Sequence, residues 1–127
     1  MSFAIVCVLV AGLMPFVAVG VAKWNRGYDN RDPRGWEDKL AGRARRAHSA
    51  HLNSFEAFPL FAVGVLFALV TGVDKTVVNS LAGVFVVARV AYVWLYLNDQ
   101  ATARSLVWMV GLAASVALLV LAALKAA

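Results

Sequence analysis

Four long runs of apolar residues dominate the chain, at residues 3–22, 52–71, 77–97 and 105–124. Each run has about the 20 residues that a helix needs to cross roughly 30 Å of hydrocarbon. The runs are continuous, whereas the strands of a membrane barrel would alternate apolar and polar residues. The pattern therefore predicts an all-α integral membrane protein, with one domain at residues 1–127 that forms a four-helix bundle.

Short polar connections predict that neighbouring helices are antiparallel. Residues 71–76 (TGVDKT) and 98–104 (NDQATAR) are turns of a few residues, which join adjacent helices of a compact bundle. The connection at residues 23–48 is longer and highly charged. Just after the turn at Pro33, at residue 35 or 36, we expect the second helix to begin and to project several turns from the membrane.

Basic residues are concentrated on one side of the predicted bundle. The connection at residues 23–48 carries most of them and Arg104 lies on the same side, whereas the opposite side has Lys75 and Lys125. Because basic flanks favour the cytoplasm, we expect a multi-pass protein of the bacterial inner membrane with both termini periplasmic. The flanks and anionic lipid headgroups also explain the net charge of +5, so no nucleic-acid partner is expected.

The second apolar run begins with a polar stretch, RRAHSAHLNSFEAFPLF, at residues 45–61. A charged group at the centre of a membrane helix costs about 2.5–3.5 kcal/mol on insertion scales, so such residues persist where they face a partner or a wet cavity. Asn53 and Glu56 are three residues apart and therefore share one face of a helix. This stretch is the predicted functional region.

The third run carries Arg89, Tyr92 and Tyr96 on one helix face. Arg89 lies at a depth similar to that of Glu56 on an antiparallel neighbour, so we expect a buried structural ion pair between Glu56 and Arg89. The remaining polar residues of these two runs fit a structural role as well as a binding role. Asn53 is equally suited to be an interhelical hydrogen-bonding residue, and the two tyrosines to be part of an interfacial aromatic belt.

Arg104 and Ser105 open the fourth apolar run. They fit either a snorkelling cation with a polar helix start, or a site that holds an anion or thiolate at a positive helix terminus. No metal site is predicted, because His48 and His51 have no cysteine or second carboxylate near them in the sequence. The single cysteine, Cys7, lies in an apolar run where packing accounts for it.

The motif AHLNSFEAFPLF, followed by ARVAYVWLY in the third run and by Arg104 and Ser105, resembles the MAPEG superfamily. These are membrane-associated proteins in eicosanoid and glutathione metabolism, and the chain is most similar to their small bacterial branch. The resemblance covers nearly the whole chain. It implies a homotrimer that binds glutathione between subunits near the cytoplasmic surface. It also implies a transferase or peroxidase acting on lipophilic electrophiles or lipid hydroperoxides, with membrane lipids around it.

The resemblance also implies roles for individual residues. Arg104 would bind or activate the thiol, with Ser105 beside it, and these two form the implied catalytic pair. The other implied ligand-binding residues lie on the second and third helices, and Arg89 would support Glu56. They are Asn53, Glu56, Tyr92, Tyr96, Arg45, Arg46 and His51.

Two positions depart from the family pattern. Ser49 stands where glutathione users commonly carry an arginine, and Ala57 where leukotriene-synthase-like members carry a tyrosine. The candidates to replace the missing cation are Arg45, Arg46, Lys23 and Arg26. Two alternatives to an enzyme therefore stay open. One is a non-catalytic trimer that binds a lipid or another anionic small molecule in the cleft between subunits, and the other is a purely structural trimer.

Overall fold

The computed structural model describes residues 2–24 and 27–127, so Arg26, one of the candidate cations, lies outside the described residues. Within them the chain forms five helices: α1 (Phe3–Lys23), α2 (Pro33–Asp38), α3 (Gly42–Val70), α4 (Lys75–Leu97) and α5 (Ala101–Ala126). All but α2 are long and apolar enough to cross a membrane. The predicted all-α fold with four membrane-spanning helices is confirmed.

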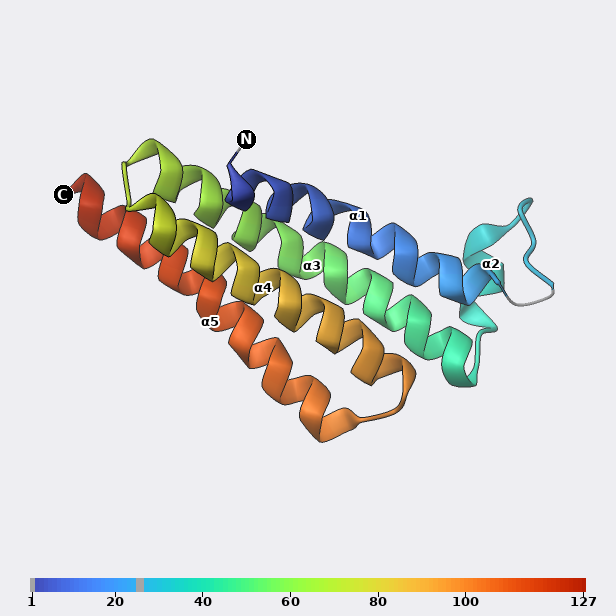
Figure 1. The fold of residues 1–127 in the computed structure, drawn as a ribbon. Coiled ribbons are helices and arrows are strands. Elements are labelled where there is room, and N and C mark those ends of the chain that lie inside the picture. Colours follow the sequence, from blue (N-terminus) through green and yellow to red (C-terminus); the bar gives the residue numbers. More distant parts are fainter. Residues whose placement is uncertain (1, 25–26) are drawn as a thin grey trace.

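The four long helices run antiparallel in chain order (Figure 1). α1 packs against α3 and α4, and α5 packs against the opposite side of the same pair. Both termini and the α3–α4 turn lie toward one end of the bundle, whereas α2 and the α4–α5 turn lie toward the other. The basic connection and Arg104 therefore share one end, as the charge asymmetry of the sequence requires.

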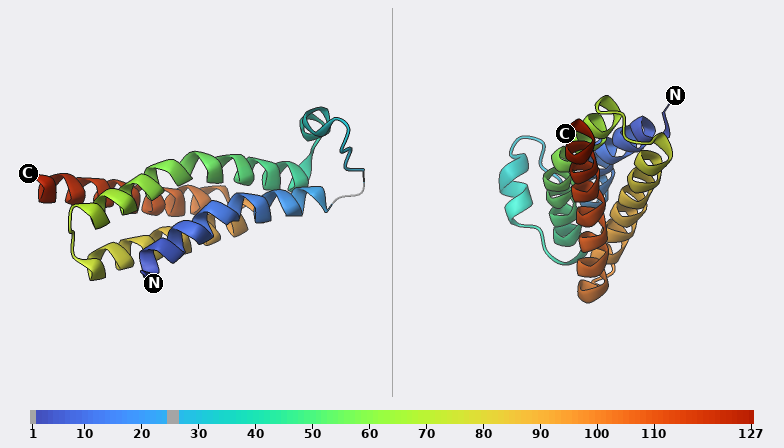
Figure 2. Two further views of the ribbon diagram at one scale, coloured as in Figure 1. Left: turned by 90° about the horizontal axis from the view of Figure 1, so that it is seen from above. Right: turned by 90° about the vertical axis from the view of Figure 1, so that its left-hand side faces the viewer.

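The predicted second helix is divided into α2 and α3, which corrects the expectation of one continuous helix from residue 35 or 36. α2 begins at Pro33 and is capped by Asp32, whose carboxylate accepts a hydrogen bond of 3.0 Å from the backbone nitrogen of Gly35. The chain leaves the helix after α2, and Gly42 then starts α3 with φ +55°. Glycine adopts this left-handed backbone without a steric cost. The break places α2 to the side of the bundle (Figure 2).

Close approach of α3 and α5 depends on a small residue. A Cβ at Gly64 would lie 3.1 Å from the Cβ of Leu118 and 3.2 Å from the carbonyl oxygen of Ser115. Between α3 and α4, the rings of Phe61 and Phe85 stack with their centroids 3.8 Å apart. Lipid provides no hydrophobic driving force between helices, so such tight van der Waals packing holds the bundle together.

Candidate functional site

A network of polar side chains connects α3 to α4 inside the bundle. The guanidinium of Arg89 donates to the Oδ1 of Asn53 at 3.0 Å and to the Oγ of Ser54 at 3.1 Å. Ser54 in turn donates to the carbonyl of Ala50 at 2.8 Å, and the amide nitrogen of Asn53 donates to Glu56 at 3.2 Å. Arg89 is only 3% exposed. Its charge is therefore hydrogen-bonded to neutral oxygens inside the membrane span.

The amide of Asn53 takes the place of the direct ion pair expected between Glu56 and Arg89. In the part of the chain that the structure describes, no salt bridge within 4.0 Å joins these two residues. Asn53 lies three residues before Glu56 on the same face of α3, and its side chain reaches Arg89 first. Its oxygen accepts from the guanidinium and its nitrogen donates to the carboxylate. The two charges are therefore linked through one amide dipole.

An open pocket of about 200 Å³, here called the interfacial cavity, lies between α3, α4 and the start of α5. It is lined by Asn53, Tyr92, Arg104, Ser105 and Trp108. The guanidinium of Arg104 lies 4.2 Å from the ring centroid of Tyr96, and Tyr96 packs edge-on against Tyr92 at 5.5 Å. The structure thus brings together residues from all three predicted polar regions, with Tyr96 supporting Arg104.

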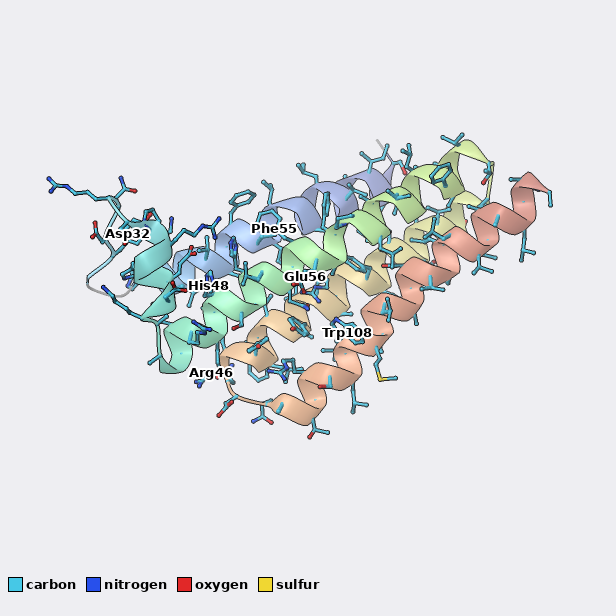
Figure 3. All side chains as sticks on the ribbon, turned by 180° about the vertical axis from the view of Figure 1, so that it is seen from behind. Asp32, Arg46, His48, Phe55, Glu56 and Trp108 are labelled. Atoms are coloured by element: carbon cyan, nitrogen blue, oxygen red, sulfur yellow. The ribbon has the colours of Figure 1, made fainter. Side chains whose placement is uncertain are left out.

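A second cavity of about 140 Å³, here called the inner cavity, lies next to the first between α3, α4 and α5 and shares Asn53 and Trp108 with it. Its further lining includes Glu56, Arg89, Leu60, Phe85, Leu112 and Ser115. Figure 3 shows Glu56 and Trp108 on the side of the bundle where α3 and α5 face each other. Glu56 therefore lies at the inner cavity, next to the interfacial one.

Four of the predicted ligand-binding residues line neither cavity. One of them, Tyr96, packs against Arg104. Arg46 donates to the carbonyl of Leu97 at 3.4 Å and so ties α3 to the end of α4. His51 bonds the carbonyl of Pro15 at 2.7 Å through Nδ1, which must carry the hydrogen because a carbonyl only accepts. His51 therefore faces α1, and Arg45 is exposed at the basic end.

Lys23 does not supply a cation to the interfacial cavity either. Its ammonium lies 4.5 Å from the ring centroid of Tyr28, in the connection between α1 and α2. Among the described residues, Arg104 is the cation that lines the interfacial cavity and Arg89 the one that lines the inner cavity. Neither Arg45 nor Arg46 of α3 therefore replaces the arginine that other members of the family carry at the position of Ser49.

The site residues predicted from the sequence do not include Ser54 or Trp108, which the structure adds to the site. Nothing in the sequence separates Ser54 from an ordinary serine that bonds its own helix, because its second partner, Arg89, comes from another helix. Trp108 did carry a signal. It lies four residues after Arg104 and three after Ser105, so it shares their helix face and reaches the same cavity.

These features define a four-helix integral membrane protein with a polar site toward one end of its bundle. A profile described as the MAPEG family matches residues 3–124. Because this match covers nearly the whole chain, the protein belongs to the MAPEG family, and the resemblance noted in the sequence is confirmed. Neither a curated protein nor a solved structure gives a significant match.

The bridging role of Asn53 predicts how these charges couple energetically. In double-mutant cycles, Asn53→Ala and Arg89→Leu should couple by about 1–2 kcal/mol in the free energy of unfolding, because the two side chains touch. Glu56→Gln and Arg89→Leu should couple more weakly than this, because the two side chains interact through the amide of Asn53 and not directly. Both coupling energies are measured by unfolding each variant with a denaturant in mild detergent and monitoring the loss of helix by circular dichroism.

Glu37→Gln combined with Arg89→Leu is the control for this experiment. Glu37 lies on α2 and bonds Arg34, so this pair should be additive. A coupling between Glu56 and Arg89 as large as that between Asn53 and Arg89 would contradict the amide bridge.

Proposed function

We propose that this MAPEG-family protein uses glutathione as a transferase or peroxidase that acts on lipophilic electrophiles or lipid hydroperoxides at the cytoplasmic membrane face. The observation that carries the proposal is the interfacial cavity. It brings Arg104 of α5 together with Asn53 of α3 and Tyr92 of α4. Glutathione is an anionic thiol peptide, so its site needs a cation beside groups that recognise amides and carboxylates.

The residues of the interfacial cavity suit such a ligand. Arg104 is steadied by the face of Tyr96, while the edge of its guanidinium can still donate hydrogen bonds. The amide nitrogen of Asn53 has two hydrogens, and the bond to Glu56 uses one of them. A second hydrogen is thus available for a carbonyl or carboxylate of the peptide. Arg89 fixes the orientation of this amide from behind.

Ser105 fits the site as an acceptor. Its hydroxyl donates to the carbonyl of Ala101 at 3.1 Å, which uses its single hydrogen. The lone pairs of the oxygen remain for an N–H or S–H group of a ligand. Ser105 would therefore receive a hydrogen bond beside Arg104, and it would rotate away from Ala101 before it could donate one.

Arg104 supplies the main electrostatic contribution to the proposed chemistry. When bound, glutathione supplies the thiol that attacks an electrophile. A guanidinium next to this sulfur favours the thiolate, which is the nucleophilic form. The position of Arg104 in the first turns of α5 adds the positive end of a helix dipole. Tyr92 offers a phenolic hydrogen to the same space, so the cavity combines charge with neutral donors.

We also propose that the protein is a homotrimer of the bacterial inner membrane with both termini periplasmic. Glu56 supports the oligomer, because its side chain is exposed on the single chain although it lies within an apolar helix. A carboxylate left in hydrocarbon is costly, and a neighbouring subunit would cover it. The basic residues at the α2 end of the bundle support the orientation.

The first test of the function is the substitution Arg104→Ala. Calorimetry with wild-type protein should detect glutathione binding, and the variant should bind at least tenfold more weakly, because a charge-assisted hydrogen bond contributes about 1.5–3 kcal/mol. Conjugation of glutathione to a hydrophobic electrophile should also be lost. Arg45→Ala is the matched control and should bind normally, since Arg45 is exposed and lies outside both cavities.

Ser49→Arg tests the departure from the family pattern in the same assay and should strengthen glutathione binding. Glutathione transfer that survives Arg104→Ala would contradict the role given to Arg104. No heat with millimolar glutathione, even in Ser49→Arg, would favour the non-catalytic lipid-binding or structural alternatives.

The oligomeric state has its own test. Native mass spectrometry in mild detergent should give the mass of three 13.6 kDa chains, and the trimer should persist on dilution. Cross-linking in intact membranes should give the same stoichiometry and controls for detergent effects. Monomers at all protein concentrations in both experiments would contradict the trimer.

The orientation is tested with reporter fusions. Alkaline phosphatase needs the oxidising periplasm for its disulfides, so a fusion at Ala127 should be active. A fusion at Asp99, in the α4–α5 turn, should be inactive and serves as the control. The reverse result would place the basic end of the bundle outside.

A further inference from the structure

An open groove of about 690 Å³, here called the lateral groove, lies between the end of α1 and the start of α3. Its walls come from these two helices, and it shares no lining residue with the interfacial or the inner cavity among the residues that the structure describes. Its volume is within the range of about 300–1,000 Å³ that is typical of ligand sites. The lining residues are Val17, Gly20, Val21, Trp24, Ala41, Arg43 and Ala44.

The lateral groove extends from the apolar part of the bundle to the level of the lipid headgroups. Val17 and Val21 belong to the first apolar run and are 69% and 37% exposed. Trp24 follows Lys23 directly after this run and is 91% exposed. Tryptophan is enriched where a membrane meets water, and basic residues flank membrane spans on the cytoplasmic side. A ligand of the lateral groove would therefore have an apolar tail at the valines and a polar head near Trp24.

The polar end of the lateral groove favours an anion. Within residues 2–24 and 27–127, Arg43 is the charged residue that lines it. α3 begins beside Arg43 at Gly42 without an acidic residue in its first turn, and no described side chain caps its backbone nitrogens. The first N–H groups of a helix have no partner within the helix and lie at the positive end of its dipole. The apolar walls thus lead to a guanidinium and to free backbone donors.

The lateral groove and Glu56 lie on different sides of α3. Arg43 is on the face of α3 that continues through Ala47 and Ala50 to Ser54, and Ser54 bonds Arg89 of α4. At about 100° per residue, Glu56 points about 140° away from Arg43 around the helix axis. A neighbouring subunit that covers Glu56 therefore contacts another side of α3. Lipid, and not a second copy of the chain, is the neighbour that suits the lateral groove.

We infer that the lateral groove binds an anionic phospholipid, with its phosphate at Arg43 and the start of α3 and an acyl chain along Val17 and Val21. A guanidinium can donate two parallel hydrogen bonds to a phosphate, which gives such a contact a defined geometry. The inference goes beyond the proposed function and does not depend on it, because the groove is separate from both cavities. It also differs from a general attraction of the basic end to anionic lipid, which would not depend on one particular arginine.

The experiment is a titration of the delipidated full chain in detergent with dioleoylphosphatidylglycerol, in which native mass spectrometry counts the bound lipids. Arg43→Ala should weaken binding about fivefold or more, because one basic residue near anionic lipid contributes roughly that factor. Gly20→Leu should weaken it about threefold or more, since its side chain occupies the place of the acyl chain. A Cβ at Gly20 meets no atom within 4 Å, so this variant keeps the fold.

Arg31→Ala is the matched control. It removes the same charge from the same basic connection, but Arg31 is exposed and does not line the lateral groove. It should bind the lipid within about twofold of wild type, because a distant exposed charge is screened. Dioleoylphosphatidylcholine, which has no net charge, should bind wild type more weakly than dioleoylphosphatidylglycerol does.

A photocross-linker at the rim identifies what occupies the lateral groove in a membrane. Trp24→benzoylphenylalanine, in vesicles of phosphatidylcholine and phosphatidylglycerol, should give adducts in which phosphatidylglycerol exceeds its share of the vesicle. Covalent dimers of the chain as the main product would place a second copy in the groove and overturn the inference.

Two results of the titration would also overturn it. One is an equal loss of binding in Arg43→Ala and Arg31→Ala, which would mean that the basic end attracts anionic lipid without a built site. The other is unchanged binding in both Arg43→Ala and Gly20→Leu. Neither result bears on the glutathione site, which is tested separately with Arg104→Ala.

Discussion

A buried guanidinium in a membrane span has to be satisfied by partners from the protein, and Arg89 imposes this constraint on the whole bundle. Arg89 is only 3% exposed, so its hydrogen-bond partners must come from the protein. α3 provides them through Asn53 and Ser54. The register between α3 and α4 therefore depends on these bonds. A slide of one helix by a turn would leave a cation without acceptors.

The same bonds prepare the candidate site. Asn53 accepts from Arg89 on one side and donates to Glu56 on the other, so its amide has one orientation. This amide lines both cavities, and a ligand in either would meet a group that is already fixed. Binding then costs less conformational entropy, because the amide is already ordered. Arg104 is fixed separately, by the ring of Tyr96. Asn53 therefore both joins α3 to α4 and lines the site, whereas Arg104 lines the site without taking part in the network around Arg89.

Much of this arrangement followed from the sequence, because hydrophobic length and helical spacing are local properties. The lengths of the apolar runs are enough to predict the four spans. The sequence also predicts that Asn53, Tyr92 and Arg104 share a site, and all three line the interfacial cavity. The prediction was wrong where a short local feature decided the result. The left-handed backbone of Gly42 divides the second helix, and a glycine in the sequence does not report its φ.

Side-chain partners were harder to predict than spans. Opposite charges at similar depth suggest that Glu56 and Arg89 touch. Spacing along a helix does not show which side chain of α3 bonds Arg89, and in the structure it is Asn53. His51 lies two residues before Asn53, yet the rotation of about 100° per residue directs it to Pro15 on α1. The sequence motifs therefore locate the site along each helix, whereas the packing of α3, α4 and α5 determines which side chains line the same cavity.

The position of the two cavities reflects the two solvents that meet at this end of the bundle. Arg104 and Ser105 stand at the start of α5, where a water-soluble anion can arrive, whereas Leu60 and Leu112 stand inside the apolar spans. The two cavities meet at Asn53 and Trp108, which line both of them. The polar network around Arg89 therefore fixes an oriented amide where the polar start of α5 meets the apolar spans.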